Sequence, residues 1–150
     1  MNNYKTHTHI GVYGLVIEDN KILLIKKKTG PYDGKLDLPG GSFEFGETPE
    51  ETLIREFKEE TNLELEEFSL FDTASKVVDW NSEYGLIKVH HIGIFYKIIS
   101  YKNNIKKKIK LDENNDDSLG AEFYEIENLS KENLSAITIM ELLKLGYNKT

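Results

Sequence analysis

Residues 41–63 read GSFEFGETPEETLIREFKEETNL, and they contain a helix with a well-marked beginning. Thr48 is an N-cap residue, and Pro49 suits the first helical position, where an N–H group would have no partner. Glu51, three residues after Thr48, completes a capping box. This pattern predicts a helix over residues 48–61.

The predicted helix carries three carboxylates on one face. Each helical residue turns by about 100°, so Glu59 and Glu60 lie at about −60° and +40° from Glu56. Leu53 and Phe57 point elsewhere and supply an apolar stripe for packing. Like charges four residues apart destabilise a helix by roughly 0.2–0.5 kcal/mol unless a cation joins them. Hard divalent ions prefer oxygen ligands, so this face is a candidate metal site, with a solvated acidic face as the alternative.

The helix also holds the only arginine of the chain, Arg55. The other eighteen of the nineteen Lys and Arg residues are lysines. A guanidinium offers a planar fork that holds one or two carboxylates in a fixed orientation. Glu44 and Glu47, in the loop before the helix, are the natural partners, although a lone arginine can also arise by chance.

Composition and charge limit the classes of function. The chain has 150 residues and no cysteine, which predicts one domain over residues 1–150 without disulfides or thiolate chemistry. The net charge of −7 argues against a general binder of nucleic acid or anionic membranes. The N-terminus lacks an apolar signal core, and no apolar run approaches the roughly 20 residues that cross a bilayer. We therefore expect a cytoplasmic protein without membrane contact.

Apolar strands surround the helix. We predict strands over residues 9–17, 21–25, 36–38, 65–70, 73–79, 86–99 and 122–126, and a second helix over residues 130–145. The residues Glu18-Asp19-Asn20 between the first two strands are typical of a hairpin turn. Strands interleaved with two helices predict one layered domain of the α/β or α+β class.

The segment resembles the Nudix box, G-x5-E-x7-R-E-U-x-E-E-x-G-U, in which U is a bulky apolar residue. Eight of the nine defined positions match in register, namely Gly41, Glu47, Arg55, Glu56, Phe57, Glu59, Glu60 and Leu63. Asn62 stands where the family has glycine, and asparagine is the next residue most tolerant of a left-handed backbone. The preceding GKLDLPGG run resembles the family's entry to the box, with Leu36 where tryptophan is common. The resemblance implies an α/β/α sandwich with a mixed β-sheet between helices.

Nudix proteins hydrolyse a diphosphate linked to another moiety, usually in nucleoside diphosphate derivatives, and need Mg²⁺ or Mn²⁺. By this resemblance, Glu56 and Glu60 are the main metal ligands and Glu59 is a ligand or a base. The main-chain carbonyl of Gly40 adds a further oxygen, and Arg55 orients the acids. Divalent ions neutralise the charge of a diphosphate and activate bound water.

A general base is still needed to take a proton from water. Many family members use a carboxylate from a loop before a late strand, and residues 112–117 (DENNDD) lie in that place. Asp117 is our first candidate, with Asp116 or Glu113 next. A glutamate of the box acting as the base, and a merely solvated loop, are the alternatives.

The residues that bind the substrate are less evident. Lys26, Lys27 and Lys28 end the second predicted strand, where they could meet phosphates, and we take Lys26 and Lys28 as candidates. Trp80, the single tryptophan, is predicted in a loop with Tyr84, where it could stack on a base. Solvated lysines and ordinary packing are the alternatives.

Two other features indicate less about function. His90 and His91 are consecutive on a strand and point to opposite faces, so they cannot form a metal pair, and ordinary sheet positions suffice for both. The run Lys106-Lys107-Lys108 is most simply solvated.

The sequence thus predicts a Nudix-type pyrophosphohydrolase that acts on a nucleotide-like small molecule with Mg²⁺ or Mn²⁺, as a monomer or homodimer. The moiety on the diphosphate stays open among oxidised nucleoside triphosphates, ADP-ribose, nucleotide sugars, dinucleoside polyphosphates and capped RNA ends. A Nudix domain that binds a nucleotide without turnover is one alternative, and a plain acidic helix in an unrelated fold is another. The intact acids argue against the sensor, because binding alone needs no metal-holding glutamates.

Overall fold

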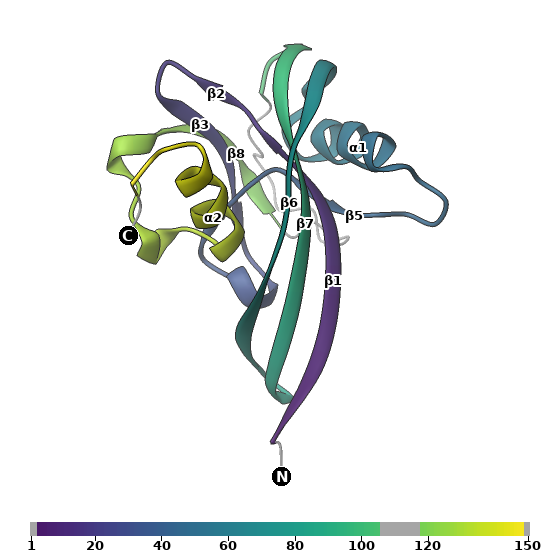
Figure 1. Ribbon diagram of the computed structural model, residues 1–150, viewed down its shortest axis with the longest axis vertical. Coiled ribbons are helices and arrows are strands. Elements are labelled where there is room, and N and C mark those ends of the chain that lie inside the picture. The colour runs from purple at the N-terminus through teal and green to yellow at the C-terminus, as the bar shows by residue number, and fades with distance from the viewer. Residues whose placement is uncertain (1–2, 106–117, 149–150) are drawn as a thin grey trace.

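The computed structural model describes residues 3–105 and 118–148, and its strands form two four-stranded sheets (Figure 1). The first sheet contains β5 (Gly40–Ser42), β1 (Tyr4–Leu15), β7 (Gly85–Lys102) and β6 (Glu64–Ser82), in that order. β1 pairs with β5 in the antiparallel sense and with β7 in the parallel sense, and β7 and β6 are antiparallel. The sheet is therefore mixed, as predicted.

The second sheet is built around one buried strand. Its strands are β2 (Ile17–Glu18), β3 (Lys21–Lys27), β4 (Leu36–Asp37) and β8 (Ser118–Glu125), and β3 pairs antiparallel with the other three. Asp19 and Asn20 form the turn between β2 and β3, with φ of 50° and 61°. Asn and Asp tolerate this left-handed conformation, which a two-residue hairpin favours. The predicted hairpin is confirmed.

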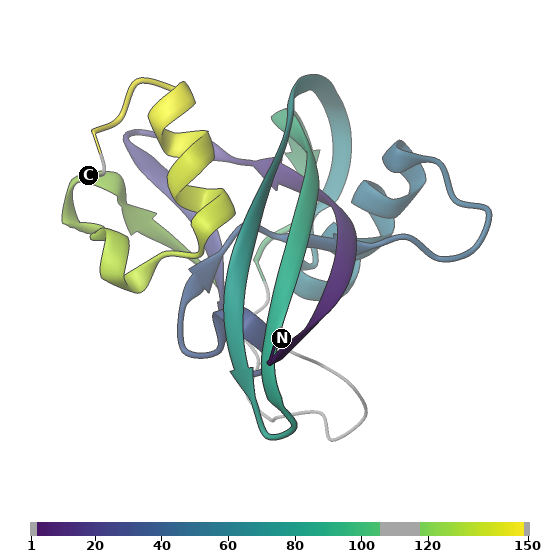
Figure 2. The same cartoon turned by 60° about the horizontal axis from the view of Figure 1, so that its bottom comes forward.

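The two helices, α1 (Pro49–Thr61) and α2 (Ala136–Lys144), lie on opposite sides of the strands (Figures 1 and 2). Val12 and Tyr13 are neighbours on β1 and point to opposite faces. Val12 packs in a core cluster with Leu53 and Phe57 of α1, whereas Tyr13 packs in a second cluster that includes Ile137 of α2. The fold is thus the α/β/α sandwich that the sequence predicts.

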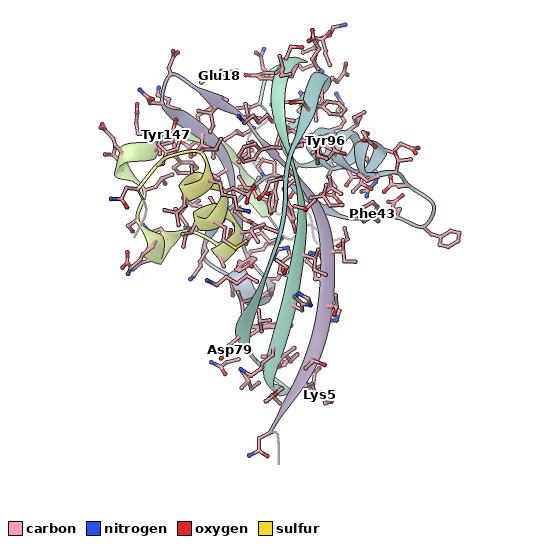
Figure 3. The ribbon with its side chains drawn as sticks, viewed as in Figure 1. Lys5, Glu18, Phe43, Asp79, Tyr96 and Tyr147 are labelled. Atoms are coloured by element: carbon pink, nitrogen blue, oxygen red, sulfur yellow. The ribbon has the colours of Figure 1, made fainter. Side chains whose placement is uncertain are left out.

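Three strands of the first sheet run well beyond the helices as a long ribbon (Figure 1). Tyr4 of β1 pairs with Leu86 of β7 near its end, and Figure 3 shows Lys5 and Asp79 there. Most side chains of the ribbon are exposed or half-buried, since neither helix covers them. β1 begins at Tyr4, five residues before the predicted start, because pairing with β7 continues to that point.

Several other predicted boundaries are wrong, and β8, for example, begins at Ser118 rather than at Glu122. β6 is one strand rather than two, since the break expected after Leu70 is a register shift between Leu70 and Asp72 within continuous pairing. The second helix starts at Ala136 rather than Ser130, because Ser135 is its N-cap. A short 3₁₀ turn precedes it, η3 (Lys131–Asn133). No helix in the described part of the chain is long and apolar enough to cross a membrane.

Candidate active site

Both ends of α1 are fixed as the sequence predicts. Thr48 Oγ1 accepts a hydrogen bond from the Glu51 amide, and Glu51 Oε1 accepts one from the Thr48 amide, each at 3.2 Å. Asn62 ends the helix with a φ of 69°, and its amide donates to the Lys58 carbonyl at 3.1 Å. The side chains between these ends therefore project in a defined direction. Figure 3 shows Tyr96 of the sheet beside this helix, where its hydroxyl donates to Glu50 at 2.9 Å.

Arg55 is at the centre of the site. Its Nε and Nη2 donate to the two oxygens of Glu47 at 2.8 and 2.9 Å. Its Nη1 donates to Glu56 Oε1 at 3.1 Å and to Glu59 Oε2 at 3.3 Å. Nη2 also donates to the Ser42 carbonyl at 3.0 Å. One planar guanidinium thus connects the loop, the face of α1 and β5, which a lysine ammonium could not do.

Glu47 is held by several donors besides Arg55. Its Oε1 accepts from the Thr52 hydroxyl at 2.9 Å and from the Glu44 amide at 2.8 Å. The hydrogen bonds from Arg55 are the main reason that the pKa of Glu47 falls to about 2, and the same pairing raises the pKa of Arg55. Glu44 Oε1 lies 3.6 Å from Arg55 Nε. The prediction that Glu44 and Glu47 are the partners of Arg55 is confirmed.

Two glycines bring the main chain against the carboxylates. The Gly40 amide donates to Glu60 Oε1 at 2.8 Å, and Glu60 is 8% exposed. A Cβ on Gly40, whose φ is 142°, would lie 2.0 Å from the Val12 carbonyl oxygen. A Cβ on Gly41 would lie 2.7 Å from the carboxyl carbon of Glu56. A side chain at position 40 would therefore collide with the main chain of β1, and one at position 41 would push the Glu56 carboxylate aside.

The site carries an excess of negative charge. Four carboxylates lie within hydrogen-bond or ion-pair distance of the one guanidinium, those of Glu44, Glu47, Glu56 and Glu59. Within residues 3–105 and 118–148, no group of three or more His, Cys, Asp or Glu side chains is arranged as a ready ion site. Oxygens of Glu56 and Glu59 contact Arg55, and Glu60 contacts Gly40, so an ion must compete with these partners. The donor set, made of carboxylate oxygens beside a glycine turn, nevertheless fits a hard divalent cation.

A cavity of about 210 Å³ lies between the ribbon and the loop that follows β3. We call it the His91 pocket. Its lining is rich in rings, and it comprises His7, His9, Tyr13, Lys27, Thr29, Gly30, Pro31, Tyr32, Asp37, Trp80, Val89 and His91. The residues come from β1, β3, β4, β6 and β7 and from a 3₁₀ turn, η1 (Gly30–Tyr32), with its N-cap Thr29.

His91 joins two tyrosines at the base of this pocket. Its Nε2 lies 2.6 Å from the Tyr13 hydroxyl, and its Nδ1 lies 2.8 Å from the Tyr32 hydroxyl. Burial is the main reason that the pKa of His91 falls to about 3, so the imidazole is neutral at neutral pH. His90 is exposed on the other face, which confirms that the two histidines point apart. Ordinary sheet packing does not account for His91, however, since it is the centre of a hydrogen-bonded network.

Tyr13 places the pocket next to the acidic site. Its main chain pairs in register with Gly40 in β5, while its side chain contacts His91. Burial and the carboxylate of Asp37 raise the pKa of Tyr13, and Glu60 and Glu56 contribute in the same direction. A molecule in the pocket would therefore lie within electrostatic reach of the glutamates of α1.

The candidate substrate residues fall in different places. Trp80 lines the pocket, but from β6 rather than from the predicted loop, and Tyr84 lies in the following turn and is 83% exposed. Lys27 lines the pocket, whereas Lys26 and Lys28 on either side of it do not. Lys26 is exposed, because neighbouring residues of a strand point to opposite faces. The candidate bases Asp117, Asp116 and Glu113, and the Lys106–Lys108 run, lie outside the described residues.

Sequence reasoning missed the polar residues at the base of the pocket. Tyr13, Tyr32 and His91 meet only in the folded chain, and no local pattern joins them. Asp37 offered one signal, because it is a carboxylate between the apolar residues Leu36 and Leu38 of a predicted strand. The structure buries it to 3% exposure.

Comparisons with known proteins identify the family of this chain. Residues 5–143 match the family described as NUDIX domain. The chain is 35% identical over 133 residues to the ADP-ribose pyrophosphatase of Methanocaldococcus jannaschii, a match that covers 87% of this chain and 71% of that protein. It is 39% identical over 56 residues to the 8-oxo-dGTP diphosphatase of Escherichia coli, covering 37% of this chain and 43% of that protein.

Solved structures show the same fold. A MutT NUDIX hydrolase from Burkholderia pseudomallei superposes with a TM-score of 0.71 at 24% identity, covering 93% of this chain and 98% of that chain. A MutT protein from Bacillus halodurans superposes with a TM-score of 0.66 at 22% identity, covering 94% of this chain and 84% of that chain. The family match spans nearly the whole chain and includes the glutamates around Arg55. The chain therefore belongs to the Nudix family, and it is a Nudix-type pyrophosphohydrolase.

Proposed function

We propose that this protein hydrolyses a phosphoanhydride bond of a nucleotide-like substrate with the help of Mg²⁺, for which Mn²⁺ can substitute. The observation that carries the proposal is the convergence of glutamates from a loop and from α1 on Arg55, beside the glycine turn that contacts Glu60. We assign the divalent ion to Glu56, Glu59 and Glu60 and to the main-chain carbonyl of Gly40. When bound, such an ion neutralises charge on the diphosphate and lowers the pKa of a bound water.

The other residues of the site position these groups. Arg55 holds Glu47 by two hydrogen bonds and contacts Glu56 and Glu59, so it sets where the carboxylates of α1 lie. Its positive charge also reduces the mutual repulsion of the acids before an ion binds. We therefore assign Arg55 an orienting role rather than that of a nucleophile.

A carboxylate must take the proton from the attacking water. We keep Asp117 as the first candidate, because the chain enters β8 at Ser118, which pairs with Lys27 of the His91 pocket. Glu59 is the alternative on the helix face, since its side chain is 56% exposed and its carboxylate contacts Arg55. Replacing each by its amide would show which one the reaction needs.

The relatives suggest two substrates to test first. The Methanocaldococcus protein is named for ADP-ribose and the Escherichia protein for 8-oxo-dGTP, and both compounds contain a phosphoanhydride attached to a nucleoside. We propose a substrate of this class for the present chain. Lys27 and Trp80 line the pocket that would receive the part of the substrate beyond the phosphates.

The proposal is tested by incubating the protein with ADP-ribose, 8-oxo-dGTP and a wider panel in Mg²⁺, and by separating the products chromatographically. We expect turnover of at least one compound that stops on chelation, and the loss of that turnover in Glu56→Gln. Glu66→Gln is the matched control, since Glu66 is an exposed glutamate that pairs with Lys102, outside the site. Nucleotide binding without any turnover would instead make the protein a sensor and overturn the proposal.

A further inference from the structure

Gly14 of β1 lies where the two halves of the acidic site meet. It is buried, and its amide donates to the Pro39 carbonyl at 3.0 Å, directly before the glycine turn (Gly40 and Gly41). The preceding residue, Tyr13, pairs in register with Gly40. The glycine turn is thus held on β1 by main-chain contacts that include Gly14. The inference drawn from this position rests on the proposed function, because it concerns how the glutamates of α1 are placed against the turn.

The other half of the site, the helix α1, packs on the same glycine. Phe57 is fully buried and lies over Gly14, where a Cβ would be only 2.5 Å from two carbons of the ring. Carbon atoms in ordinary van der Waals contact are about 3.5–4.0 Å apart. The φ of Gly14 is not positive, so an alanine could adopt its backbone conformation. The close approach of the Phe57 ring is therefore what requires glycine at this position.

Tyr96 holds the first turn of α1 beside this contact. It pairs in register with Gly14 from the neighbouring strand β7, and its hydroxyl donates to Glu50 Oε1 at 2.9 Å (Figure 3). Glu50 and Phe57 are seven residues apart, so they lie on one face of α1. The helix is thus fixed to the Gly14–Tyr96 pair at two points, two turns apart, and its distance from the sheet is set by what these two positions allow.

The ring of Phe57 has little room to turn away from an added methyl group. It belongs to a core cluster with Val12 and Leu53, and Ile98 Cδ1 would lie 3.1 Å from the same Cβ. Protein cores are close-packed, so overpacking produces shifts of the backbone as well as of side chains. β1 is held by β5 on one side and by β7 on the other. The clash is therefore relieved mainly by a movement of α1 away from the sheet.

Such a movement would separate the glutamates from the glycine turn. Glu56 precedes Phe57 in α1, and Glu60 follows it by three residues. Glu60 Oε1 accepts from the Gly40 amide at 2.8 Å, and the Glu56 carboxylate lies directly against Gly41. Restoring ordinary contact from 2.5 Å takes a displacement of about 1 Å. A misplacement of about 1 Å in a catalytic site can lower the rate about 100-fold.

We propose that Gly14 is a positioning residue for the hydrolysis. Because it has no side chain, it sets the distance of α1 from β1, and thereby the distance of Glu56 and Glu60 from the glycine turn. Gly14 acts through Phe57 rather than by touching the reacting groups. The geometry in which the glutamates and the turn would hold a divalent ion is then defined by this one packing contact on the far side of the helix.

The Gly40 amide reports the position of α1 without substrate or metal, because it donates across to Glu60. Its proton chemical shift is measured by NMR in chelator for wild type, Gly14→Ala and Glu60→Ala, which lacks the acceptor. We expect Gly14→Ala to move the Gly40 amide upfield, toward its value in Glu60→Ala. The Leu23 amide, which donates to the Val16 carbonyl at 3.0 Å, is the reference and should not move. The shift describes the folded protein, so a loss of stability alone leaves it unchanged.

Phe57→Leu provides the rescue, because leucine lacks the ring carbons that meet the added Cβ. Gly14→Ala alone should lower turnover about 10- to 100-fold, and should weaken Mg²⁺ binding about tenfold in calorimetry. The double variant Gly14→Ala/Phe57→Leu should return both quantities to within about threefold of those of Phe57→Leu alone. Equal effects of Gly14→Ala in the two backgrounds would mean that the helix contact is unimportant, and would overturn the proposal.

Gly93→Ala is the control for overpacking elsewhere in the same sheet. A Cβ there would lie 2.3 Å from the ring of Phe95, which packs in the core cluster on the side of α2. Urea unfolding should show a loss of stability in this variant as in Gly14→Ala, while the Gly40 amide shift and the Mg²⁺ affinity stay at their wild-type values. Equal changes of the Gly40 shift in both variants would also overturn the proposal.

These outcomes bear on Gly14 separately from the hydrolysis. An upfield Gly40 amide in Gly14→Ala that returns on adding Phe57→Leu supports the positioning role even if no compound is hydrolysed. An unmoved Gly40 amide overturns that role but leaves the proposed function intact. If Gly14→Ala does not fold, the double variant decides: a folded protein with the Gly40 shift of Phe57→Leu supports the proposal, and a displaced shift or failure to fold overturns it.

Discussion

The Gly40 amide donates a hydrogen bond of 2.8 Å to Glu60 Oε1, so the glycine turn and the last carboxylate of α1 are joined across twenty residues of sequence. Glu60→Gln keeps an oxygen that can accept this bond but removes the charge. We expect the free energy of unfolding to change by no more than about 1 kcal/mol, while turnover falls about 100-fold or more. Urea unfolding and a Mg²⁺ titration by calorimetry measure the two effects. Wild-type turnover in this variant would remove Glu60 from the site.

Arg55→Lys should be damaging although it conserves charge. Lysine cannot contact Glu47 with two parallel hydrogen bonds while reaching Glu56, Glu59 and the Ser42 carbonyl. We expect turnover to fall by about 10- to 100-fold, as when residues that orient metal ligands are replaced. The reverse change on the same helix, Lys58→Arg, is the control, and it should leave turnover unchanged. Equal rates in both variants would mean that the planar fork is unimportant.

Glu47→Gln tests the pairing with Arg55 through pH. The pKa of Glu47 is lowered to about 2 in the folded protein, so its pairing stabilises the fold above the ordinary glutamate pKa of about 4.5. This stabilisation is lost as the pH falls from about 4.5 toward 2. Wild type should therefore exceed Glu47→Gln in unfolding free energy at pH 7, and the difference should shrink in acid. Chemical denaturation at a series of pH values measures it, and a difference that does not vary with pH would contradict the pairing.

Glu141 on α2 should show the opposite pH dependence. It is fully buried and neither carboxylate oxygen has a hydrogen-bond partner among the described residues, while Lys144 Nζ lies 3.9 Å from Oε2. Burial, and then the nearby carboxylate of Asp72, raise the pKa of Glu141 to about 8. The folded state thus holds a proton that the unfolded state releases near its ordinary pKa of about 4.5, and stability falls as the pH rises between these values.

Glu141→Gln removes this dependence. The free energy of unfolding of the variant should therefore exceed that of wild type by on the order of 2 kcal/mol at pH 9, and the two should be equal at pH 4. Thermal and chemical unfolding at the two pH values measure the gain. Glu127→Gln, at an exposed position, is the control and should show no trend. A gain of equal size at both pH values would indicate a packing effect instead of titration.

Asn62→Gly should be tolerated. Asn62 has a φ of 69°, which glycine adopts without strain, but the side-chain hydrogen bond to the Asn104 carbonyl at 3.1 Å is lost. The two effects oppose each other, so the free energy of unfolding should change by less than about 1 kcal/mol. Asn62→Val, which cannot adopt this φ cheaply, should destabilise by more than the glycine variant does. The reverse order would show that the left-handed backbone is not what ends α1.

The parts of the site that the sequence predicts are those governed by neighbours along the chain. The capping box of Thr48 and Glu51, the left-handed Asn62 and the proximity of Arg55 to Glu47 all involve residues within one loop and one helix. Helix geometry and capping act over a few residues, so a linear pattern contains enough information to predict them.

The features that the sequence did not predict depend on contacts between distant segments of the chain. Ser130 and Ser135 are equally suitable caps for the second helix, and Ser135 is the cap because its hydroxyl also donates to the buried Asp37. Trp80 lies in β6 rather than in the predicted loop because the pairing between β6 and β7 continues past the apolar pattern, up to Ser82 and Gly85. Such pairing is a property of two strands together, and neither strand alone reveals it.

Neighbouring side chains of β1 point to opposite faces of the sheet, and this arrangement affects how the His91 pocket could change in evolution. Tyr13 contacts the glycine turn through its main chain and His91 through its side chain, so it is shared by the acidic site and the His91 pocket. Trp80 pairs with Ile87 and Val89 pairs with His7, so both lie farther along the ribbon than Tyr13 does. Substitutions at that outer end can therefore reshape the pocket while the glutamates around Arg55 stay in place.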